Sequence, residues 1–476
     1  MSFSSNAEID RAISLAKAKA DADPLRPTYH FHPPAQWMND PNGTCYADGW
    51  YHVFYQHNPF NDWWDHMHWG HARTRDFVHW EYLPIALYPD NDPAEGHCFS
   101  GCCVVRSSHD PLIFYTSVAK NRDEKPNRQR VAIGSRDLLT WQKLAVPAVQ
   151  ISDAPAGTKN DWRDPYVFEH DGRSYMVVGA VIPYEGTSRA STLLFEAEDE
   201  TLLRWRYRGL LFVGDPSLSF LECPNFFSLE GRWVHLYSPR EPVQYHTGRF
   251  FPETGALDVE LSGLVDHSSE YYATNTIRDD RGRTILLGWV RGFPKGHGWN
   301  GCHAIPRELK MDRQGRLVQA PIAETEELRT HHRVEDADTI RRPRTTIPCA
   351  PSGAMEIAAT LAMAPGSELS ISLQAGERSL FSIQVDHASM RVEGLPVPFE
   401  RDTSSPREGT LRVFLDRSVV EIFADNGRHC VTRVIEDLLA ADRIVFGRKG
   451  AAEIKSLESW EMAPLSYSVP DVPVNA

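Results

Sequence analysis

The sequence predicts an all-β protein, in which a five-bladed β-propeller is followed by a C-terminal β-sandwich and preceded by a short helix. Three observations predict this fold. Many short runs alternate apolar and polar residues between turn residues. A pattern of an acidic residue, an apolar pair and a tryptophan recurs at Trp80, Trp141 and Trp205, which lie 61 and then 64 residues apart. This pattern stops near residue 326, before a second series of alternating runs begins.

Residues 1–27 are expected to form a helical extension. Ser5 is followed three residues later by Glu8, which is the pattern of a helix capping box. Ile9 and Ile13 then recur at helical spacing in a segment rich in alanine and lysine, and a proline ends it. We therefore expect one N-terminal helix that lies on the body of the protein.

Residues 28–328 are expected to form the propeller. Runs of apolar and aromatic residues follow glycine-containing turns, as β-hairpin strands do, at 51–56, 175–178, 233–237 and 284–289. About four such strands fit into each period, which leaves room for five blades. Their innermost strands would start near Asp40, Phe99, Asp164, Glu222 and Tyr272. An unrelated all-β sandwich with chance tryptophan spacing remains the alternative.

The remainder of the chain is expected to hold a second domain. Residues 329–348 are rich in charge and then in arginine, proline and threonine, which favours a linker. Residues 349–463 predict a β-sandwich, with alternating strands at 369–373, 380–385, 411–415 and 419–423. Residues 464–476 are expected to form an extended tail.

Charge and composition narrow the class of partner. The net charge of −14 argues against nucleic acid and against an anionic membrane, because both need a basic surface. A neutral small molecule fits better, and 13 tryptophans offer rings for stacking on sugars, although most of them should be core. No secretory signal or long apolar stretch is visible, so a cytoplasmic location is expected. The eight cysteines lack paired C-x-x-C spacing, which favours reduced thiols.

Three carboxylates stand beside prolines at the predicted blade starts. Asp40 lies within Trp-Met-Asn-Asp-Pro-Asn-Gly at 37–43, Asp164 precedes a proline, and Glu222 stands two residues before one. In a propeller all three could point into one central funnel. Crowded carboxylates can divide the work of cleaving a glycosidic bond, since one stays ionised as nucleophile while another keeps a proton to donate. A separation of roughly 5 to 5.5 Å would imply retention of configuration.

These segments resemble the three signatures of glycoside hydrolase family 32, which contains the invertases, levanases and other β-fructofuranosidases. The signatures correspond to 37–43, to Arg-Asp-Pro at 163–165 and to Glu-Cys-Pro at 222–224, in that order. The resemblance continues through 55–59, 67–72, 99–101, 306–309 and 420–423, and so covers nearly the whole chain after the first helix. The fold of that family, a five-bladed propeller followed by a β-sandwich, agrees with the repeat pattern.

The resemblance implies a retaining glycosidase that removes terminal β-D-fructofuranosyl units from sucrose or short fructooligosaccharides. By similarity Asp40 is the nucleophile, Glu222 the acid and base, and Asp164 the residue that holds fructose hydroxyls. The remaining residues expected to line the fructose pocket are Trp37, Asn39, Gln56, Trp64, Phe99, Ser100, Arg163, Tyr272 and Trp289. No cofactor and no metal are implied. The expected partner is a small sugar, and self-association of the chain stays open.

Two departures from the family pattern leave the outer rim of the pocket open. Residues 266–275 differ from the usual acidic segment, and Cys102 and Cys103 stand where serine or small apolar residues are more usual. Alternatives therefore remain: a fructosyltransferase that makes fructooligosaccharides, or a carbohydrate-binding propeller without activity. A metal enzyme using His66, His68 and His71 is a further alternative, but no acidic or cysteine ligand completes that set.

Overall fold

The computed structural model describes residues 6–90, 95–121, 125–399 and 406–470. Strands dominate these residues, with 35 strands against two α-helices, α1 (Asn6–Ala22) and α2 (Ala337–Arg341). Short 3-10 helices lie at Ile151–Asp153, Ala323–Leu328, Asp425–Gly427 and Glu436–Ala440. The prediction of an all-β protein with one N-terminal helix is therefore confirmed.

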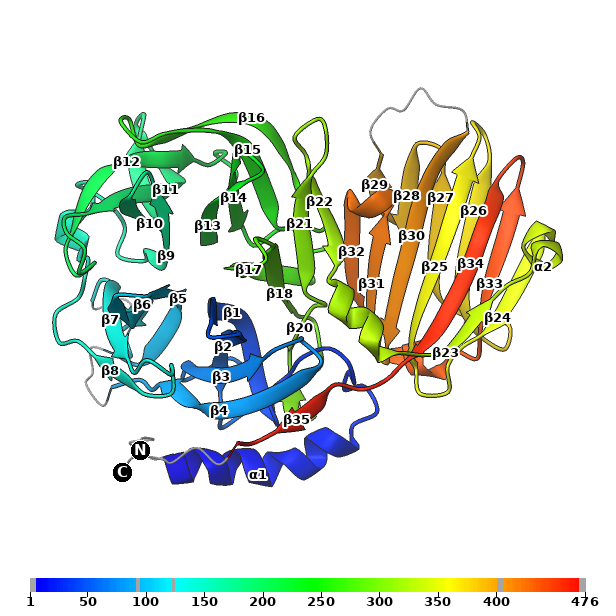
Figure 1. Ribbon diagram of the computed structural model, residues 1–476, viewed down its shortest axis with the longest axis horizontal. Helices are drawn as coiled ribbons and strands as arrows, with labels where there is room; N and C mark the ends of the chain where they lie inside the picture. Colours follow the sequence, from blue (N-terminus) through cyan, green and yellow to red (C-terminus); the bar gives the residue numbers. More distant parts are fainter. Residues whose placement is uncertain (1–5, 91–94, 122–124, 400–405, 471–476) are drawn as a thin grey trace.

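Five sheets surround a common centre, and two further sheets stack beside them (Figure 1). The first sheet has the order β19-β1-β2-β3-β4-β35. Its strands are β1 (Gln36–Ala47), β2 (Trp50–Asn58), β3 (His68–Thr74), β4 (His79–Leu87), β19 (Trp299–Asn300) and β35 (Ser466–Ser468). The second sheet has the order β5-β6-β7-β8, with β5 (His97–Arg106), β6 (His109–Val118), β7 (Arg128–Gly134) and β8 (Trp141–Lys143).

The other three sheets of the ring are also built mainly from antiparallel neighbours. The third contains β9 (Arg163–His170), β10 (Arg173–Tyr184), β11 (Thr187–Ala197) and β12 (Trp205–Val213). The fourth contains β13 (Glu222–Leu229), β14 (Arg232–Ser238), β15 (Gln244–Phe251) and β16 (Ala256–Leu264). The fifth contains β17 (Tyr271–Arg278), β18 (Thr284–Val290), β20 (Cys302–His303), β21 (Arg307–Met311) and β22 (Leu317–Pro321).

The first strands of the five sheets form a closed inner ring. Strand β1 contacts β5 and β17, while β9 contacts β5 and β13, and β13 contacts β17. Each of these strands comes first in chain order among the antiparallel strands of its sheet. Figure 1 shows that each lies near the common centre. Apolar side chains of neighbouring sheets pack between them, as Phe114, Met176 and Phe195 do between the second and third sheets. Residues distant in sequence are thereby brought to one centre.

The tryptophan repeat corresponds to a recurring turn before the fourth strand of a sheet. The indole Nε1 groups of Trp80, Trp141 and Trp205 each donate to the carbonyl three residues earlier, at 3.1, 3.0 and 2.8 Å. The residues that accept these bonds, at positions 77, 138 and 202, all have φ near +60°. Because these residues are not glycine, the hydrogen bond from the indole helps to hold a backbone conformation that is otherwise unfavourable.

The two remaining sheets, together called the sandwich, enclose a second hydrophobic core. One has the order β23-β34-β25-β30-β31-β32, with β23 (Arg329–Val334), β25 (Ala354–Met363), β30 (Arg407–Asp416), β31 (Val419–Ala424), β32 (His429–Val434) and β34 (Glu453–Met462). The other has the order β24-β33-β26-β27-β28-β29, with β24 (Arg344–Pro348), β26 (Glu368–Ala375), β27 (Arg378–Asp386), β28 (Ser389–Val392), β29 (Leu395–Pro398) and β33 (Arg443–Lys449).

Two of the expected boundaries are wrong. Residues 329–348, expected to be a linker, form β23, α2 and β24, and so supply one edge strand to each sheet of the sandwich. Their charged side chains suit a strand that is exposed on one side. In the expected tail 464–476, β35 pairs in parallel with β4 of the first sheet. The remainder of that tail, from 471 on, lies outside the described residues, as does Ser5 of the expected capping box.

A buried network of charges joins the inner ring to the sandwich. The guanidinium of Arg307, fully buried, donates to Glu421 at 2.7 Å and to Asp266 at 3.0 Å. Glu421 also bonds His30 at 3.0 Å, and the other ring nitrogen of His30 bonds Asp416 at 2.8 Å. Three parts of the chain therefore meet in one network: the segment after α1, the fifth sheet and the sandwich.

None of the helices in the described ranges is long and apolar enough to cross a membrane. The cytoplasmic location stays a prediction.

Candidate active site

The innermost strands begin irregularly, and this irregularity aims the site residues at the centre. Pairing with the next strand shifts register at 38–41 in β1, at 98–101 in β5, at 222–225 in β13 and at 272–275 in β17. Such a shift turns side chains away from the regular alternation. Asp164 and Cys223 add a positive φ, of 68° and 48°, directly before a proline. Backbone strain of this kind is typical of functional sites.

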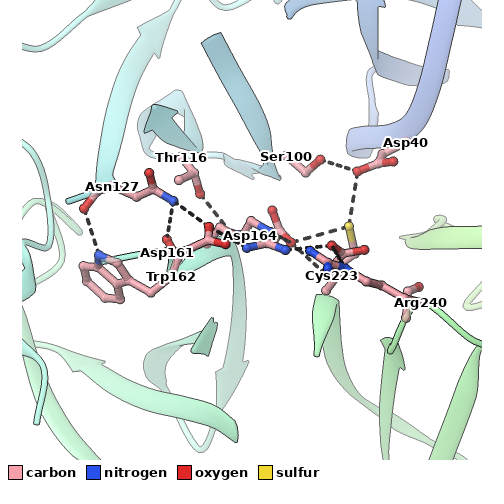
Figure 2. Close-up of polar contacts among 12 residues, drawn as sticks. Asp40, Ser100, Thr116, Asn127, Asp161, Trp162, Asp164, Cys223 and Arg240 are labelled. Atoms are coloured by element: carbon pink, nitrogen blue, oxygen red, sulfur yellow. Dashed lines mark hydrogen bonds and ion pairs between the residues drawn. The ribbon is translucent and has the colours of Figure 1, made fainter. Parts of the chain in front are cut away.

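Asp40, on β1, is held by short hydrogen bonds (Figure 2). One carboxylate oxygen accepts from Asn39 Nδ2 at 2.9 Å. The other accepts from Ser100 Oγ at 2.5 Å and from Cys223 Sγ at 3.4 Å. Burial raises the pKa of Asp40, and the bonds from Ser100 and Asn39 counter that rise only in part. The carboxylate is thus oriented on three sides.

Asp164 lies on β9, which β5 separates from β1 in the ring, and it is almost fully buried. Its backbone N–H donates to Thr116 Oγ1 at 2.9 Å, and its Oδ2 accepts from the Cys223 N–H at 2.9 Å (Figure 2). Burial raises the pKa of Asp164 to about 7, against the lowering effect of the Arg163 guanidinium. The Sγ of Cys223 lies 3.8 Å from Asp164 and 3.4 Å from Asp40, so Cys223 joins the two carboxyl groups.

Glu222, at the start of β13, has cationic partners instead. Arg163 Nη2 donates to its Oε1 at 2.7 Å, and Arg240 Nε lies 3.3 Å from the same oxygen. The Tyr272 hydroxyl donates to Oε2 at 2.5 Å. Burial acts to raise the pKa of Glu222, but Arg163, Tyr272 and Arg240 outweigh it, and the pKa is lowered. The pKa is therefore raised at Asp40 and Asp164 and lowered at Glu222.

The sequence-predicted residues line one pocket, with an open volume of about 920 Å³ that includes its mouth. They are Asn39, Asp40, Gln56, Trp64, Phe99, Ser100, Arg163, Asp164, Glu222, Tyr272 and Trp289. Trp37 does not line the pocket. Its indole donates to Asn39 at 2.7 Å and packs edge-on against Trp289, with 5.6 Å between ring centroids. Trp37 therefore supports the wall from behind.

Aromatic and amide side chains shape the side of the pocket formed by the first two sheets. Trp64 is 40% exposed, stacks on His97 at 5.2 Å and meets Phe99 edge-on at 5.8 Å. Gln56 is buried, and its Nε2 donates to the carbonyl of Cys98 at 2.8 Å. An exposed indole beside fixed amide groups can hold a sugar ring by one apolar face and by its hydroxyls.

Two residues of the pocket wall were not predicted from the sequence. Arg240 lies in the turn between β14 and β15, and Arg291 directly follows β18. The guanidinium of Arg291 lies 4.1 Å from the centre of the Tyr272 ring, and its Nε donates to the Ser269 carbonyl at 2.7 Å. An arginine in a turn has no sequence pattern of its own, although the unusual 266–275 segment pointed to this rim.

The two departures from the family pattern have different structural roles. In the 266–275 segment, Glu270 accepts from the Val434 N–H at 2.6 Å and so connects the rim to the sandwich. Cys102 is buried, and its sulfur accepts from the Val167 N–H at 3.3 Å. The first departure therefore borders the pocket through Ser269 and Arg291, while Cys102 packs between strands β5 and β9.

The three histidines of the metal alternative are separately engaged. His68 Nδ1 bonds the carbonyl of His66 at 2.5 Å, and His71 bonds His52 at 3.0 Å. Across the described residues, no group of three or more His, Cys, Asp or Glu side chains could hold a metal ion.

Comparison with known proteins gives the family. The model of the glycosyl hydrolases family 32 N-terminal domain matches residues 30–321, and that of the family 32 C-terminal region matches 324–461. The chain belongs to glycosyl hydrolase family 32. A sucrose-6-phosphate hydrolase of Klebsiella pneumoniae is 32% identical, over 88% of this chain and 90% of its own length. One from Escherichia coli is 28% identical, over 92% and 94%.

The structural comparison agrees with this assignment. A family 32 β-fructofuranosidase of Bombyx mori superposes with a TM-score of 0.81 at 27% identity, covering 98% of this chain and 99% of its own. A variant of that enzyme has been solved in complex with sucrose. The family and the enzyme class predicted from the sequence are confirmed: the protein is a glycosidase of the β-fructofuranosidase type.

Proposed function

We propose that this protein is a retaining β-fructofuranosidase, built as a five-bladed β-propeller with a C-terminal β-sandwich. It removes terminal β-D-fructofuranosyl units from sucrose and short fructooligosaccharides and passes them to water. The observation that carries the proposal is the convergence of Asp40, Asp164 and Glu222, from three different sheets, on one pocket with an exposed tryptophan. The only partner required is a small sugar.

Asp40 is the proposed nucleophile, because it is an oriented carboxylate with no cationic side chain bonded to it among the described residues. It attacks the anomeric carbon of the fructose unit and forms a covalent fructosyl-enzyme. The bonds from Ser100 and Asn39 fix its direction of attack before the substrate arrives. Burial in the pocket also removes water that would otherwise stabilise the free carboxylate.

Glu222 is the proposed acid and base. It gives a proton to the oxygen of the leaving sugar as the glycosidic bond breaks, and it then takes a proton from the water that attacks the fructosyl-enzyme. It lies on β13 and lines the same pocket as Asp40, as this role requires. Tyr272 and Arg163 hold its two oxygens in a fixed plane.

Asp164 is proposed to bind fructose hydroxyls and to support the positive charge of the transition state. Its carboxyl group is buried beside Asp40 and joined to it through Cys223. Hydrogen bonds to sugar hydroxyls that strengthen in the transition state can supply several kcal/mol of stabilisation. The fructose pocket is completed by the aromatic and amide residues around Trp64.

The deciding experiment separates released fructose and glucose from transfer products after incubation with sucrose, kestose, inulin and levan. We expect free fructose as the main product, and we expect Asp40→Ala to lower turnover by at least about 10⁴-fold. If Asp40→Ala kept most of the activity, the proposed mechanism would be wrong. Transfer products that dominate at high sucrose would identify a fructosyltransferase, and tight binding without turnover would identify a carbohydrate-binding protein.

A second candidate substrate is sucrose phosphorylated on its glucose unit. Two observations favour it: Arg240 and Arg291 place two guanidinium groups on the wall of the pocket, and both bacterial relatives described above are named sucrose-6-phosphate hydrolases. Guanidinium groups bind phosphate oxygens well. The ratio of kcat/KM for sucrose 6-phosphate to that for sucrose decides between the two substrates.

A further inference from the structure

Glu222, the proposed acid, has two cationic partners and a hydroxyl donor, although a proton donor needs none of them. Glu222 Oε1 accepts from two guanidinium groups, those of Arg163 at 2.7 Å and Arg240 at 3.3 Å, and Oε2 accepts from the Tyr272 hydroxyl. All three partners favour the ionised carboxylate. A general acid must hold a proton before it can give one, so weakening any of these contacts when substrate binds raises the fraction of Glu222 that is protonated.

Arg163 is fixed in place. Its side chain is almost fully buried, its Nη1 bonds Asp161 at 2.6 Å, and its guanidinium lies 3.7 Å from the centre of the Phe220 ring. Arg163 cannot leave Glu222 without losing all of these contacts. Tyr272 is equally constrained, because its hydroxyl also accepts from the Arg240 N–H at 2.7 Å.

Arg240 is built differently. Its backbone is anchored by the bond to Tyr272 in a turn with φ of 69°, but its side chain is 59% exposed. A single contact of 3.3 Å joins its Nε to Glu222. Glu222 is only 19% exposed, but the solvent around the guanidinium of Arg240 weakens this contact, so Arg240 can exchange it for another anion. The backbone of Arg240 is therefore fixed, whereas its guanidinium can move away from Glu222.

We infer that Arg240 is an exchangeable counter-ion of Glu222, which leaves it for an anionic group on the leaving sugar and so lets Glu222 take up the proton that it donates. This inference rests on the proposed function for the identity of Glu222 as the acid. The proton comes from solvent and converts the carboxylate of Glu222 to the carboxylic acid. Arg240 is a positioning residue, since it acts through Glu222.

The exchange makes the protonation of the acid depend on the substrate. A neutral leaving sugar leaves Arg240 beside Glu222, whereas a phosphorylated one offers oxygens that bind a guanidinium more strongly than a single 3.3 Å contact does. Removing Arg240 takes away one of the causes that lower the pKa of Glu222, so that pKa moves upward. The basic limb of the pH profile, which reports loss of the acid's proton, then moves to higher pH.

The test measures kcat against pH for sucrose and for sucrose 6-phosphate, whose phosphate carries at least one negative charge throughout the working range. In the wild-type enzyme we expect the basic limb to lie at higher pH with sucrose 6-phosphate. In Arg240→Gln we expect the two limbs to coincide, with about a tenfold loss of kcat/KM for sucrose 6-phosphate relative to sucrose. Coinciding limbs in the wild type, or separate limbs in Arg240→Gln, would overturn the inference.

Arg291→Gln is the matched control. Arg291 also lines the pocket, but no hydrogen bond or ion pair joins it to Glu222 in the described part of the chain. It should lower affinity for sucrose 6-phosphate and keep the separation between the two limbs. If Arg291→Gln also merged the limbs, the separation would reflect general positive charge in the pocket and the role given to Arg240 would be wrong.

A binding experiment separates failure of this inference from failure of the proposed function. Calorimetry with Asp40→Asn and sucrose 6-phosphate, in two buffers of different ionisation enthalpy, counts the protons taken up on binding. We expect uptake in Asp40→Asn and its loss in Asp40→Asn/Arg240→Gln. Equal uptake in both variants would overturn the inference, whether or not the wild-type enzyme hydrolyses either sugar.

Discussion

Replacing Arg307 by methionine should destabilise the protein strongly while leaving the pocket residues untouched. Arg307 is fully buried between the ring and the sandwich, and it donates to Glu421 at 2.7 Å, Asp266 at 3.0 Å and Thr432 Oγ1 at 2.9 Å. Methionine fills a similar volume but leaves the buried Asp266 without its cationic partner and leaves Glu421 with His30 alone. Removing one partner of a buried ion pair typically costs about 3 to 5 kcal/mol.

The hydrogen bonds that Glu421 and Asp266 keep in Arg307→Met decide where in this range the loss of unfolding free energy should fall. Glu421 keeps His30 at 3.0 Å and the Ile305 N–H at 2.6 Å. Asp266 keeps the Thr432 hydroxyl and two backbone N–H donors, at Ser268 and Thr432. Because both carboxylates retain hydrogen bonds, we expect a loss nearer to about 3 kcal/mol.

The assay is urea unfolding followed by tryptophan fluorescence, with Arg249→Met as control. Arg249 pairs with Asp258 at 3.0 Å, but both side chains are more than half exposed, so its loss should cost less than about 1 kcal/mol. Adding Asp266→Asn to Arg307→Met should restore part of the stability, because the carboxylate that lost its cationic partner is no longer charged. A loss below about 1 kcal/mol for Arg307→Met would refute the reasoning.

Three further predictions concern the same site and network. Glu222→Ala should lower kcat by about 10² to 10⁴-fold for sucrose and much less for an activated aryl fructoside, which needs no proton; equal losses in a kinetic comparison would contradict its role as acid. Cys223→Ala should lower kcat by about 3 to 10-fold, because Asp40 loses a donor, and a fall beyond about 10³-fold would point to a direct chemical role. Bonds to Asp416 and Glu421 raise the pKa of His30 to about 9, against the effect of burial. Protonated His30 therefore contributes on the order of 3 kcal/mol to the free energy of unfolding. This contribution is complete below pH 6.5, the pKa of the unfolded chain, and is lost as the pH rises through 9. Thermal unfolding from pH 7 to 10 should show this fall, and His30→Gln should flatten it.

Much of the fold could be predicted because local patterns and tertiary structure agree here. The alternating runs at 51–56, 175–178, 233–237 and 284–289 lie within β2, β10, β14 and β18. The tryptophan pattern marks a real turn, repeated three times with the same indole hydrogen bond. By contrast, 329–348 looked like a linker because strands at the edge of a sheet carry charge on their exposed side, which is also typical of linkers.

The carboxylates of the site could be predicted because each has an unusual local sequence, a proline beside an acid. The irregular register at the strand starts, which turns these side chains toward the centre, has no sequence pattern. Arg240 was missed for a related reason. It contacts Glu222 only because the turn after β14 returns to the pocket, and no spacing along the chain records that contact.

The charges of the pocket connect the chemistry to the choice of substrate. In the proposed mechanism Arg163, held by Asp161 and Phe220, stays paired with Glu222 whichever substrate is bound. Arg240 lies on an exposed turn, where a change of residue costs the fold little and, by the inference made above for Glu222, would alter both the protonation of Glu222 and the charge offered to the leaving sugar. Selection of the leaving sugar can therefore change through such turns, while the strand starts that carry Asp40, Asp164 and Glu222 stay the same.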